Sequence, residues 1–185
     1  MEIKLGTLEI RSALEHPEMM ASAVFASLKA LSRSETIGVA EIDPALSDTA
    51  AFCERYRVPF ERAANCVVLE ARRADKEWLS ACVVLANTRA DVNGLVRRTL
   101  DARRASFAPM QEAVEKSGME YGAITPIGLP ADWPIFVDAA VVAAEYVIIG
   151  SGIRRSKLVV PGAILRALPG VQVLERLGLP KGEVS

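Results

Sequence analysis

Short apolar runs bounded by glycine, proline or charged residues recur along this chain, and they limit its fold more than any other feature. Three of them are Ile135–Val137, Tyr146–Ile149 and Leu158–Val160. Two more, Cys66–Leu69 and Leu79–Leu85, flank a charged stretch that suits the solvated end of a hairpin. Runs of this length between backbone-breaking residues are typical of β-strands, and the last two are predicted to form an antiparallel pair.

Helical patterns separate these predicted strands. The clearest one follows Asp91, where apolar residues recur at the spacing of one helical face as far as Leu100. Further helices are predicted over residues 17–31, from Ser47 or Asp48 through Tyr56, from Pro109 to Gly118, and from Pro161 towards Leu168. The sequence therefore predicts a mixed α/β domain with many short strands.

The length of 185 residues fits one domain of ordinary size. Apolar residues make up 51% of the chain and charged residues 24%, which is the balance of a soluble globular protein. Near Thr36 the sequence changes from a helical stretch to short β-rich runs. Residues 1–36 are therefore predicted to form an N-terminal elaboration packed on a main domain of residues 37–185. The formal net charge is −1, so any bound nucleic acid would have to meet a local basic patch.

The residue inventory argues against several kinds of site. No apolar run reaches the roughly 20 residues of a membrane span, and no signal segment is seen, so a cytoplasmic protein without membrane contact is expected. Cys66 and Cys82 lie in apolar runs without a neighbouring histidine, which favours packing over a nucleophilic role. The single histidine, His16, supports neither a Ser-His-Asp triad nor a histidine-rich zinc site. We expect no metal and no cofactor.

Glycine and proline are densest in the second half of the chain. The stretch Gly122–Pro130 carries a GxxxP pattern, and Ile135–Asp138 and the Gly-rich turn Gly150–Arg155 follow it. This ordered set resembles the loop, the strand ending in Asp, and the turn of the YbaK/EbsC family, the editing domains associated with prolyl-tRNA synthetase. The resemblance covers roughly residues 37–175. It implies an α+β fold with a largely antiparallel, multi-stranded sheet or barrel and surrounding helices.

The resemblance also implies an activity. Such a protein is a trans-acting deacylase that hydrolyses the ester between a wrong amino acid and the terminal ribose of tRNA, without a metal. The expected partner is the acceptor end of mischarged tRNA, with an aminoacyl-tRNA synthetase as a second candidate and no DNA. Catalysis is expected from main-chain groups, because a residue without Cβ lets N–H and C=O groups approach a ligand closely.

The resemblance assigns catalytic positions to Gly122 in the ester site, Pro126 in the turn, and Asn65. The positions assigned to substrate binding are Ala123, Thr125, Asp138, Gly150, Ser151, Gly152, Arg154 and Arg155. Structural alternatives stay open for these segments: an ordinary turn for the GxxxP loop, a backbone acceptor for Asp138, a tight strand connection at the Gly-rich turn, and solvated charges for the arginines. Trp78 and Trp133 are candidates for stacking on the terminal adenine but receive no assignment.

One position departs from the family pattern. Family members with editing activity usually place a lysine where this chain has Asn65. An amide can hydrogen-bond a ribose or carbonyl oxygen, but it supplies no positive charge. Two alternatives to a hydrolase therefore remain: a non-catalytic module that binds tRNA ends or an aminoacyl ligand, and a regulatory domain without tRNA contact.

Overall fold

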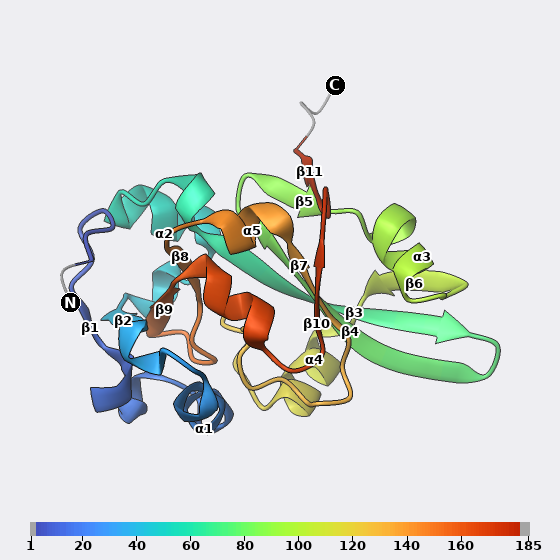
Figure 1. The fold of residues 1–185 in the computed structure, drawn as a ribbon, viewed down its shortest axis with the longest axis horizontal. Coiled ribbons are helices and arrows are strands. Elements are labelled where there is room, and N and C mark those ends of the chain that lie inside the picture. Colours follow the sequence, from blue (N-terminus) through green and yellow to red (C-terminus); the bar gives the residue numbers. More distant parts are fainter. Residues whose placement is uncertain (1–2, 182–185) are drawn as a thin grey trace.

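Two β-sheets that meet at one edge form the centre of the molecule, and short helices flank them (Figure 1). The computed structural model describes residues 3–181, so residues 1, 2 and 182–185 of the two predicted segments lie outside it. The fold is mixed α/β with mostly antiparallel strand pairs, as predicted from the family resemblance. None of the helices between residues 3 and 181 is long and apolar enough to span a membrane.

The first sheet has four antiparallel strands in the order β1-β2-β9-β8. These are β1 (Ile10–Ser12), β2 (Gly38–Glu41), β8 (Val147–Gly150) and β9 (Ser156–Val160). Every residue of β8 and β9 is buried, which explains why these strands read as continuous apolar runs instead of alternating ones. At the end of this pair Gly150 lies opposite Lys157.

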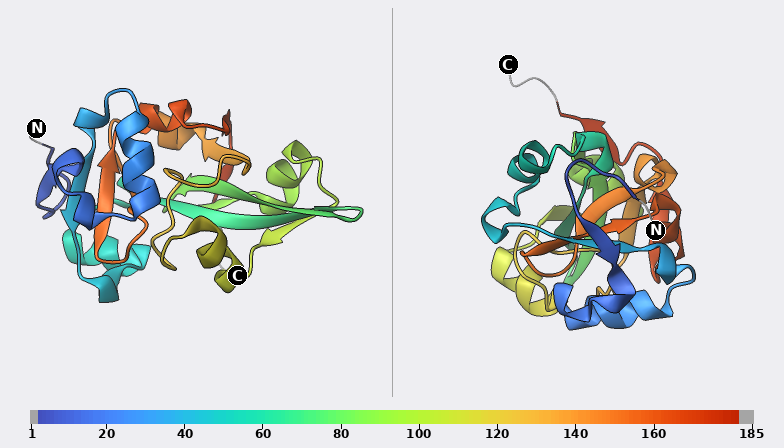
Figure 2. Two further views of the ribbon diagram at one scale, coloured as in Figure 1. Left: turned by 90° about the horizontal axis from the view of Figure 1, so that it is seen from below. Right: turned by 90° about the vertical axis from the view of Figure 1, so that its left-hand side faces the viewer.

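The second sheet has five strands in the order β10-β7-β4-β3-β6. They are β3 (Ala64–Arg73), β4 (Lys76–Leu85), β6 (Arg104–Phe107), β7 (Ile135–Asp138) and β10 (Val171–Leu174). The predicted β3–β4 hairpin is present, but its strands continue through the charged stretch to a tight turn at Ala74 and Asp75. Pairing of β3 with β6 supports this outer half, which extends beyond the rest of the molecule (Figure 2).

The two sheets meet at the beginning of β3. Ala63, which precedes β3, forms a parallel bridge with Ile148 of β8. A separate antiparallel pair of β5 (Thr88–Ala90) and β11 (Gly178–Pro180) lies near the other end of β4. This junction brings the start of β3 close to the end of β8, and the candidate site lies there.

Within residues 3–181, five α-helices lie around the sheets: α1 (Ser22–Ala30), α2 (Thr49–Tyr56), α3 (Arg97–Thr99), α4 (Met110–Ser117) and α5 (Ala139–Ala143). Two predicted helices differ in detail. The segment predicted over 17–31 begins with a separate 3₁₀ turn, and α1 starts only at Ser22. The segment predicted to end near Leu168 is a 3₁₀ helix over Gly162–Ala167.

The helix predicted after Asp91 is a π-helical turn that continues into α3. The Asp91 carboxylate accepts hydrogen bonds from the N–H groups of Gly94 at 3.0 Å and Leu95 at 2.8 Å, so it caps this wide turn. A Cβ at Gly94 would collide with that carboxylate, so glycine is needed for the close approach. Periodicity alone does not distinguish such a turn from an ordinary α-helix.

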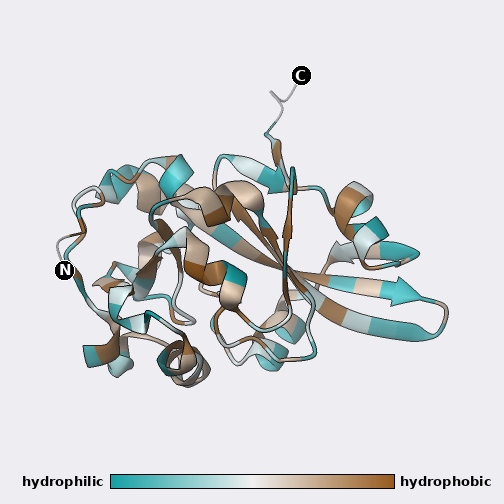
Figure 3. Cartoon of the chain, viewed as in Figure 1, coloured by the Kyte–Doolittle hydropathy of each residue, from teal (hydrophilic) through white to brown (hydrophobic). Residues whose placement is uncertain are grey.

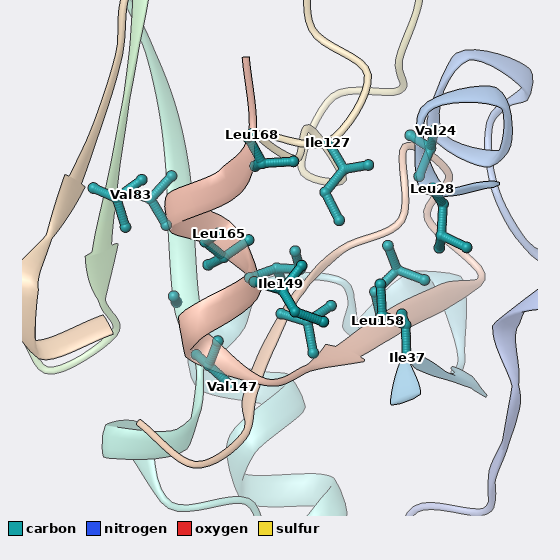
Figure 4. Close-up of a cluster of buried hydrophobic side chains, with 14 of the residues drawn as sticks. Val24, Leu28, Ile37, Val83, Ile127, Val147, Ile149, Leu158, Leu165 and Leu168 are labelled. Atoms are coloured by element: carbon teal, nitrogen blue, oxygen red, sulfur yellow. The ribbon is translucent and has the colours of Figure 1, made fainter. Parts of the chain in front are cut away.

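The main hydrophobic core includes side chains from both sheets and from the N-terminal segment (Figure 4). Val24 and Leu28 of α1 are fully buried against Ile37, Ile149 and Leu158. The predicted N-terminal elaboration therefore contributes both a strand, β1, and core residues to the domain. Hydrophilic residues gather instead at the tip of the long hairpin (Figure 3).

Candidate functional site

A cavity of about 580 Å³ opens where the two sheets meet. Its lining comes from the start of α2, the first half of β3, the segment from the end of β6 into α4, and the 121–124 loop. Gly150 and Lys157, the paired residues at the end of β8 and the start of β9, also line it, as do Phe60, Ala86 and Lys181. This volume lies within the range of about 300–1,000 Å³ that is typical of small-molecule sites.

Gly122 lines this cavity and is exposed, with a φ of 79° that favours glycine. Its N–H has no hydrogen-bond partner among residues 3–181. The loop around it is nevertheless fixed, because Ala123 N–H donates to Glu120 O at 3.0 Å and Gly152 N–H donates to Ala123 O at 2.9 Å. A preorganised loop with an unused N–H can act as a hydrogen-bond donor to a ligand.

The Arg154 side chain holds this loop against the segment that precedes α2. Its Nη1 donates to Tyr121 O at 3.2 Å, and its Nη2 donates to Pro44 O at 3.0 Å. Its own N–H donates to a Glu120 carboxylate oxygen at 2.6 Å. Arg154 therefore positions the loop beside Gly122, and its predicted contact with substrate stays a prediction.

Asn65 lies at the start of β3 and lines the cavity. Its Oδ1 accepts a hydrogen bond from the Thr49 hydroxyl at 2.5 Å, so the amide nitrogen is the group left for a ligand. Asp48 caps α2 next to it by accepting from Ala50 N–H at 3.0 Å and Ala51 N–H at 3.3 Å. Of the two residues predicted at the start of this helix, Asp48 is the cap, and the helix itself begins at Thr49.

Lys157 is the residue of this cavity that sequence reasoning missed. It lines the cavity with a side chain that is only 7% exposed, and burial lowers its pKa to about 8. Its ammonium donates to Ser47 O at 3.1 Å and lies 5.6 Å from the centre of the Phe52 ring. No other hydrogen bond of this ammonium is formed within the described chain, so two of its three donors remain available to a ligand.

The signal that could have revealed Lys157 is its position in the sequence. It stands directly before the apolar run Leu158–Val160, whose strand is buried throughout. A lysine at the border of such a strand must either reach solvent or enter a polar cavity, because an isolated buried ammonium is costly. Among the charged residues of this segment, only Arg154 and Arg155 were predicted to bind substrate.

Several of the predicted site residues do not line the cavity. Ala123, Thr125 and Pro126 are buried beneath the loop, and the Thr125 hydroxyl has no hydrogen-bond partner in the described part. Ser151 is buried and bonds Ser156, with 2.7 Å between their hydroxyl oxygens. These residues support the loop and the turn.

Three further predicted positions contact other parts of the fold. Gly152 packs against α1, because a Cβ there would lie 2.5 Å from that of Ala21. Arg155 donates to Glu18 O at 2.5 Å in the N-terminal segment. Asp138 accepts from Ala140 N–H at 2.8 Å and Gly178 N–H at 2.5 Å, which matches the structural alternative considered for it. The structure thus brings Gly122, Asn65 and Gly150 together in one cavity, with Arg154 beside them.

The other reactive side chains are engaged in packing. Cys66 lines the cavity, but burial raises the pKa of its thiol to about 12, so it carries almost no thiolate at neutral pH. Trp133 is buried at 5% exposure, and neither Trp133 nor Trp78 lines the cavity. Across residues 3–181, His, Cys, Asp and Glu side chains form no cluster of three or more that could hold a metal ion.

The chain is thus an α/β domain with a cavity at the junction of its two sheets, beside a fixed Gly-rich loop, and the comparisons specify its kind. Residues 43–168 match the family of aminoacyl-tRNA editing domains, and the chain belongs to that family. This confirms the resemblance found in the sequence. Among proteins with curated descriptions, none matches the chain.

Solved structures share the fold at low sequence identity. A candidate trans-editing enzyme for prolyl tRNA synthetase is 19% identical with a TM-score of 0.71, and the match covers 87% of this chain and 96% of that one. A hypothetical protein is 18% identical with a TM-score of 0.73 over 85% of this chain and 99% of the other. A candidate signal transduction protein from Marinobacter aquaeolei, 16% identical, has a TM-score of 0.52, covering 84% of this chain and 30% of that protein.

Proposed function

We propose that this editing domain is a trans-acting aminoacyl-tRNA deacylase, which hydrolyses the ester of a mischarged tRNA. The observation that carries the proposal is one cavity lined by Gly122, Asn65 and Lys157, three residues that keep unused hydrogen-bond donors. These groups are hydrogen-bond donors and a cation, which suit an ester whose carbonyl oxygen gains negative charge during hydrolysis.

The proposed mechanism assigns each group a role. The Gly122 N–H donates to the carbonyl oxygen as the tetrahedral intermediate forms, and Lys157 stabilises the negative charge electrostatically. The Asn65 amide nitrogen donates to the terminal ribose or to the ester. Water adds to the carbonyl carbon, and the bond between that carbon and the ribose oxygen breaks. The proton lost by the water passes by way of the neighbouring ribose hydroxyl to the leaving ribose oxygen, which gives the free amino acid and the deacylated tRNA. Asp138 and the thiols take no part in this scheme.

Lys157 also bears on the missing family lysine. Asn65 occupies that position and supplies no charge, but Lys157 places an ammonium in the same cavity from another strand. Although Asn65 replaces the family lysine, the cavity still contains a cation, because Lys157 lines it. This supports a working hydrolase over a module that only binds.

The test is deacylation of a panel of mischarged tRNAs by the wild-type protein and by a Gly122→Ala variant. Alanine at a φ of 79° is strained by about 1 kcal/mol and shifts the N–H. We expect kcat/KM to fall by about 100-fold or more, as for the loss of an oxyanion donor. If the wild-type protein releases amino acid from none of these tRNAs faster than buffer alone does, the proposed deacylase activity is wrong.

Gly118→Ala is the matched control for this variant. Gly118 also has a positive φ, 66°, and ends α4, but a Cβ there has no atom within 4 Å. It should show the same backbone strain with wild-type activity. Equal loss of activity in both variants would show that strain, and not the Gly122 N–H, is responsible.

The rival function is a binding module for tRNA ends or an aminoacyl ligand, favoured by the absent charge at Asn65. An Asn65→Lys variant separates the two functions. Faster hydrolysis in that variant identifies an enzyme with a modified site, whereas tight tRNA binding without turnover in both forms identifies the module. If added tRNA does not raise the melting temperature of the protein, neither function holds and a domain without tRNA contact remains.

A further inference from the structure

Four large apolar side chains are exposed in the described part of the chain, and all four line the same cavity. Their exposed fractions are 42% for Phe60, 68% for Phe107, 57% for Met110 and 59% for Tyr121. We call these four residues the apolar rim. Single exposed apolar residues scattered over a surface are ordinary, but their concentration at one opening marks an interaction site.

The rim is assembled from separate parts of the chain. Phe60 starts the 3₁₀ turn before β3, Phe107 ends β6, Met110 starts α4, and Tyr121 precedes Gly122. Local sequence patterning therefore does not explain the grouping, because only the tertiary fold brings these segments together. Three of the four side chains, Phe60, Phe107 and Tyr121, are aromatic.

We propose that the apolar rim stacks the unpaired nucleobases at the 3′ end of a nucleic acid whose terminal ester enters the cavity. This inference rests on the proposed function, which places the ester beside Gly122 and so places the adjoining nucleotides at the cavity mouth. Aromatic side chains bind unpaired bases of any sequence, because every base has a π-face.

The charges of the lining favour a nucleic acid over a protein segment. The cavity holds two lysines, Lys157 and Lys181, and one carboxylate, Asp48, which is engaged in capping α2. An apolar protein segment covering the rim would bury the free donors of Lys157 without partners, which is costly. A nucleotide brings ribose hydroxyls and phosphate oxygens that accept from these donors.

The experiment uses an uncharged RNA minihelix that ends in a single-stranded 3′ tail with 2-aminopurine in place of the terminal adenine. Stacking on an aromatic ring quenches 2-aminopurine fluorescence, so the signal reports the contact itself and needs no hydrolysis. We expect the wild-type protein to quench this signal. A Phe107→Ala, Tyr121→Ala double variant should lose most of the quenching and bind at least about 10-fold more weakly, because stacking contributes that much per base.

Phe25→Ala is the control, since Phe25 is a half-buried aromatic residue of α1 that does not line the cavity. It should keep wild-type quenching. Absence of quenching by the wild-type protein, unchanged quenching by the double variant at an unchanged melting temperature, or equal competition by a blunt-ended duplex would each overturn the proposal. Binding of a protein partner at the rim, in place of the RNA tail, would likewise overturn the proposal.

The two proposals can fail separately. Hydrolysis by the wild-type protein together with unchanged quenching in the double variant removes the rim inference and keeps the deacylase. Quenching that depends on the rim, without hydrolysis of any mischarged tRNA, keeps the rim and removes the deacylase.

Discussion

The Lys157 side chain gives the cavity a cation, and burial of that charge lowers the free energy of unfolding of the protein. In the folded protein, burial disfavours the charged ammonium of Lys157 and lowers its pKa to about 8. In the unfolded chain the pKa of this lysine is the ordinary 10.5. Below pH 8 both states carry the proton, and the full cost of burying the charge is present. As the pH rises from 8 to 10.5 only the unfolded state stays protonated, so the folded state gains stability.

A Lys157→Met variant tests this balance. Methionine fills a similar volume without a charge, so we expect the variant at pH 7 to be as stable as the wild type or up to about 2 kcal/mol more stable, although Ser47 O loses its donor. Deacylation should fall by about 100-fold or more, because the cation beside the ester is gone. Urea unfolding at several pH values and steady-state kinetics measure the two effects.

The pH dependence supplies the control. Between pH 8 and 10.5 the wild-type protein should gain free energy of unfolding relative to Lys157→Met, by on the order of 3 kcal/mol. The other titrating groups are common to both proteins and cancel in the difference. A constant difference over this range would mean that Lys157 is not buried as a cation.

At the scale of elements, the position of the Gly122 loop depends on Arg154. This side chain joins the loop to the segment before α2 through Tyr121 O and Pro44 O. An Arg154→Met variant keeps the aliphatic stem and removes both bonds, so the loop should open more often. We expect kcat to fall by about 10- to 100-fold with a smaller change in KM, and the amides of residues 121–124 to exchange faster with solvent.

Arg155→Met is the comparison for this prediction. Arg155 is the next residue, but its side chain donates to Glu18 O in the N-terminal segment, and it does not line the cavity. This variant should keep the wild-type kcat and the wild-type exchange of the loop. If Arg155→Met lowers kcat as much as Arg154→Met does, the loss reflects general loosening of the β8–β9 turn and not the loop clamp.

The elements themselves were largely predictable, because apolar runs and helical spacing are local signals. The exact ends of the strands and the strands with which they pair were not predictable. Strand β3 pairs with β4 as far as Arg73 and with β6 along its outer half, and β7 lies parallel to both β4 and β10. Such pairings depend on segments far apart in the sequence, which no local pattern encodes. Gly122 was assigned from a local motif, whereas the pairing of Lys157 with Gly150 across β8 and β9 is not part of any motif.

At the scale of the whole molecule, the N-terminal segment belongs to the core. Met19, Met20, Val24 and Leu28 are all buried in the main cluster, and β1 completes the edge beyond β2. Burial of a side chain of this size contributes about 1.5–3 kcal/mol, so the four together contribute on the order of 10 kcal/mol. That is comparable to the entire stability of an ordinary domain, about 5–15 kcal/mol.

A chain that lacks residues 1–36 should therefore fail to fold, although the family match begins only at residue 43. We expect the truncated protein to lose cooperative thermal unfolding and dispersed amide signals in NMR spectra. Leu28→Ala in the full chain gives a graded version, with a destabilisation of about 2–5 kcal/mol, because a fully buried leucine leaves a cavity. A truncated protein that unfolds cooperatively near the wild-type melting temperature would show instead that residues 37–181 hold their core without α1.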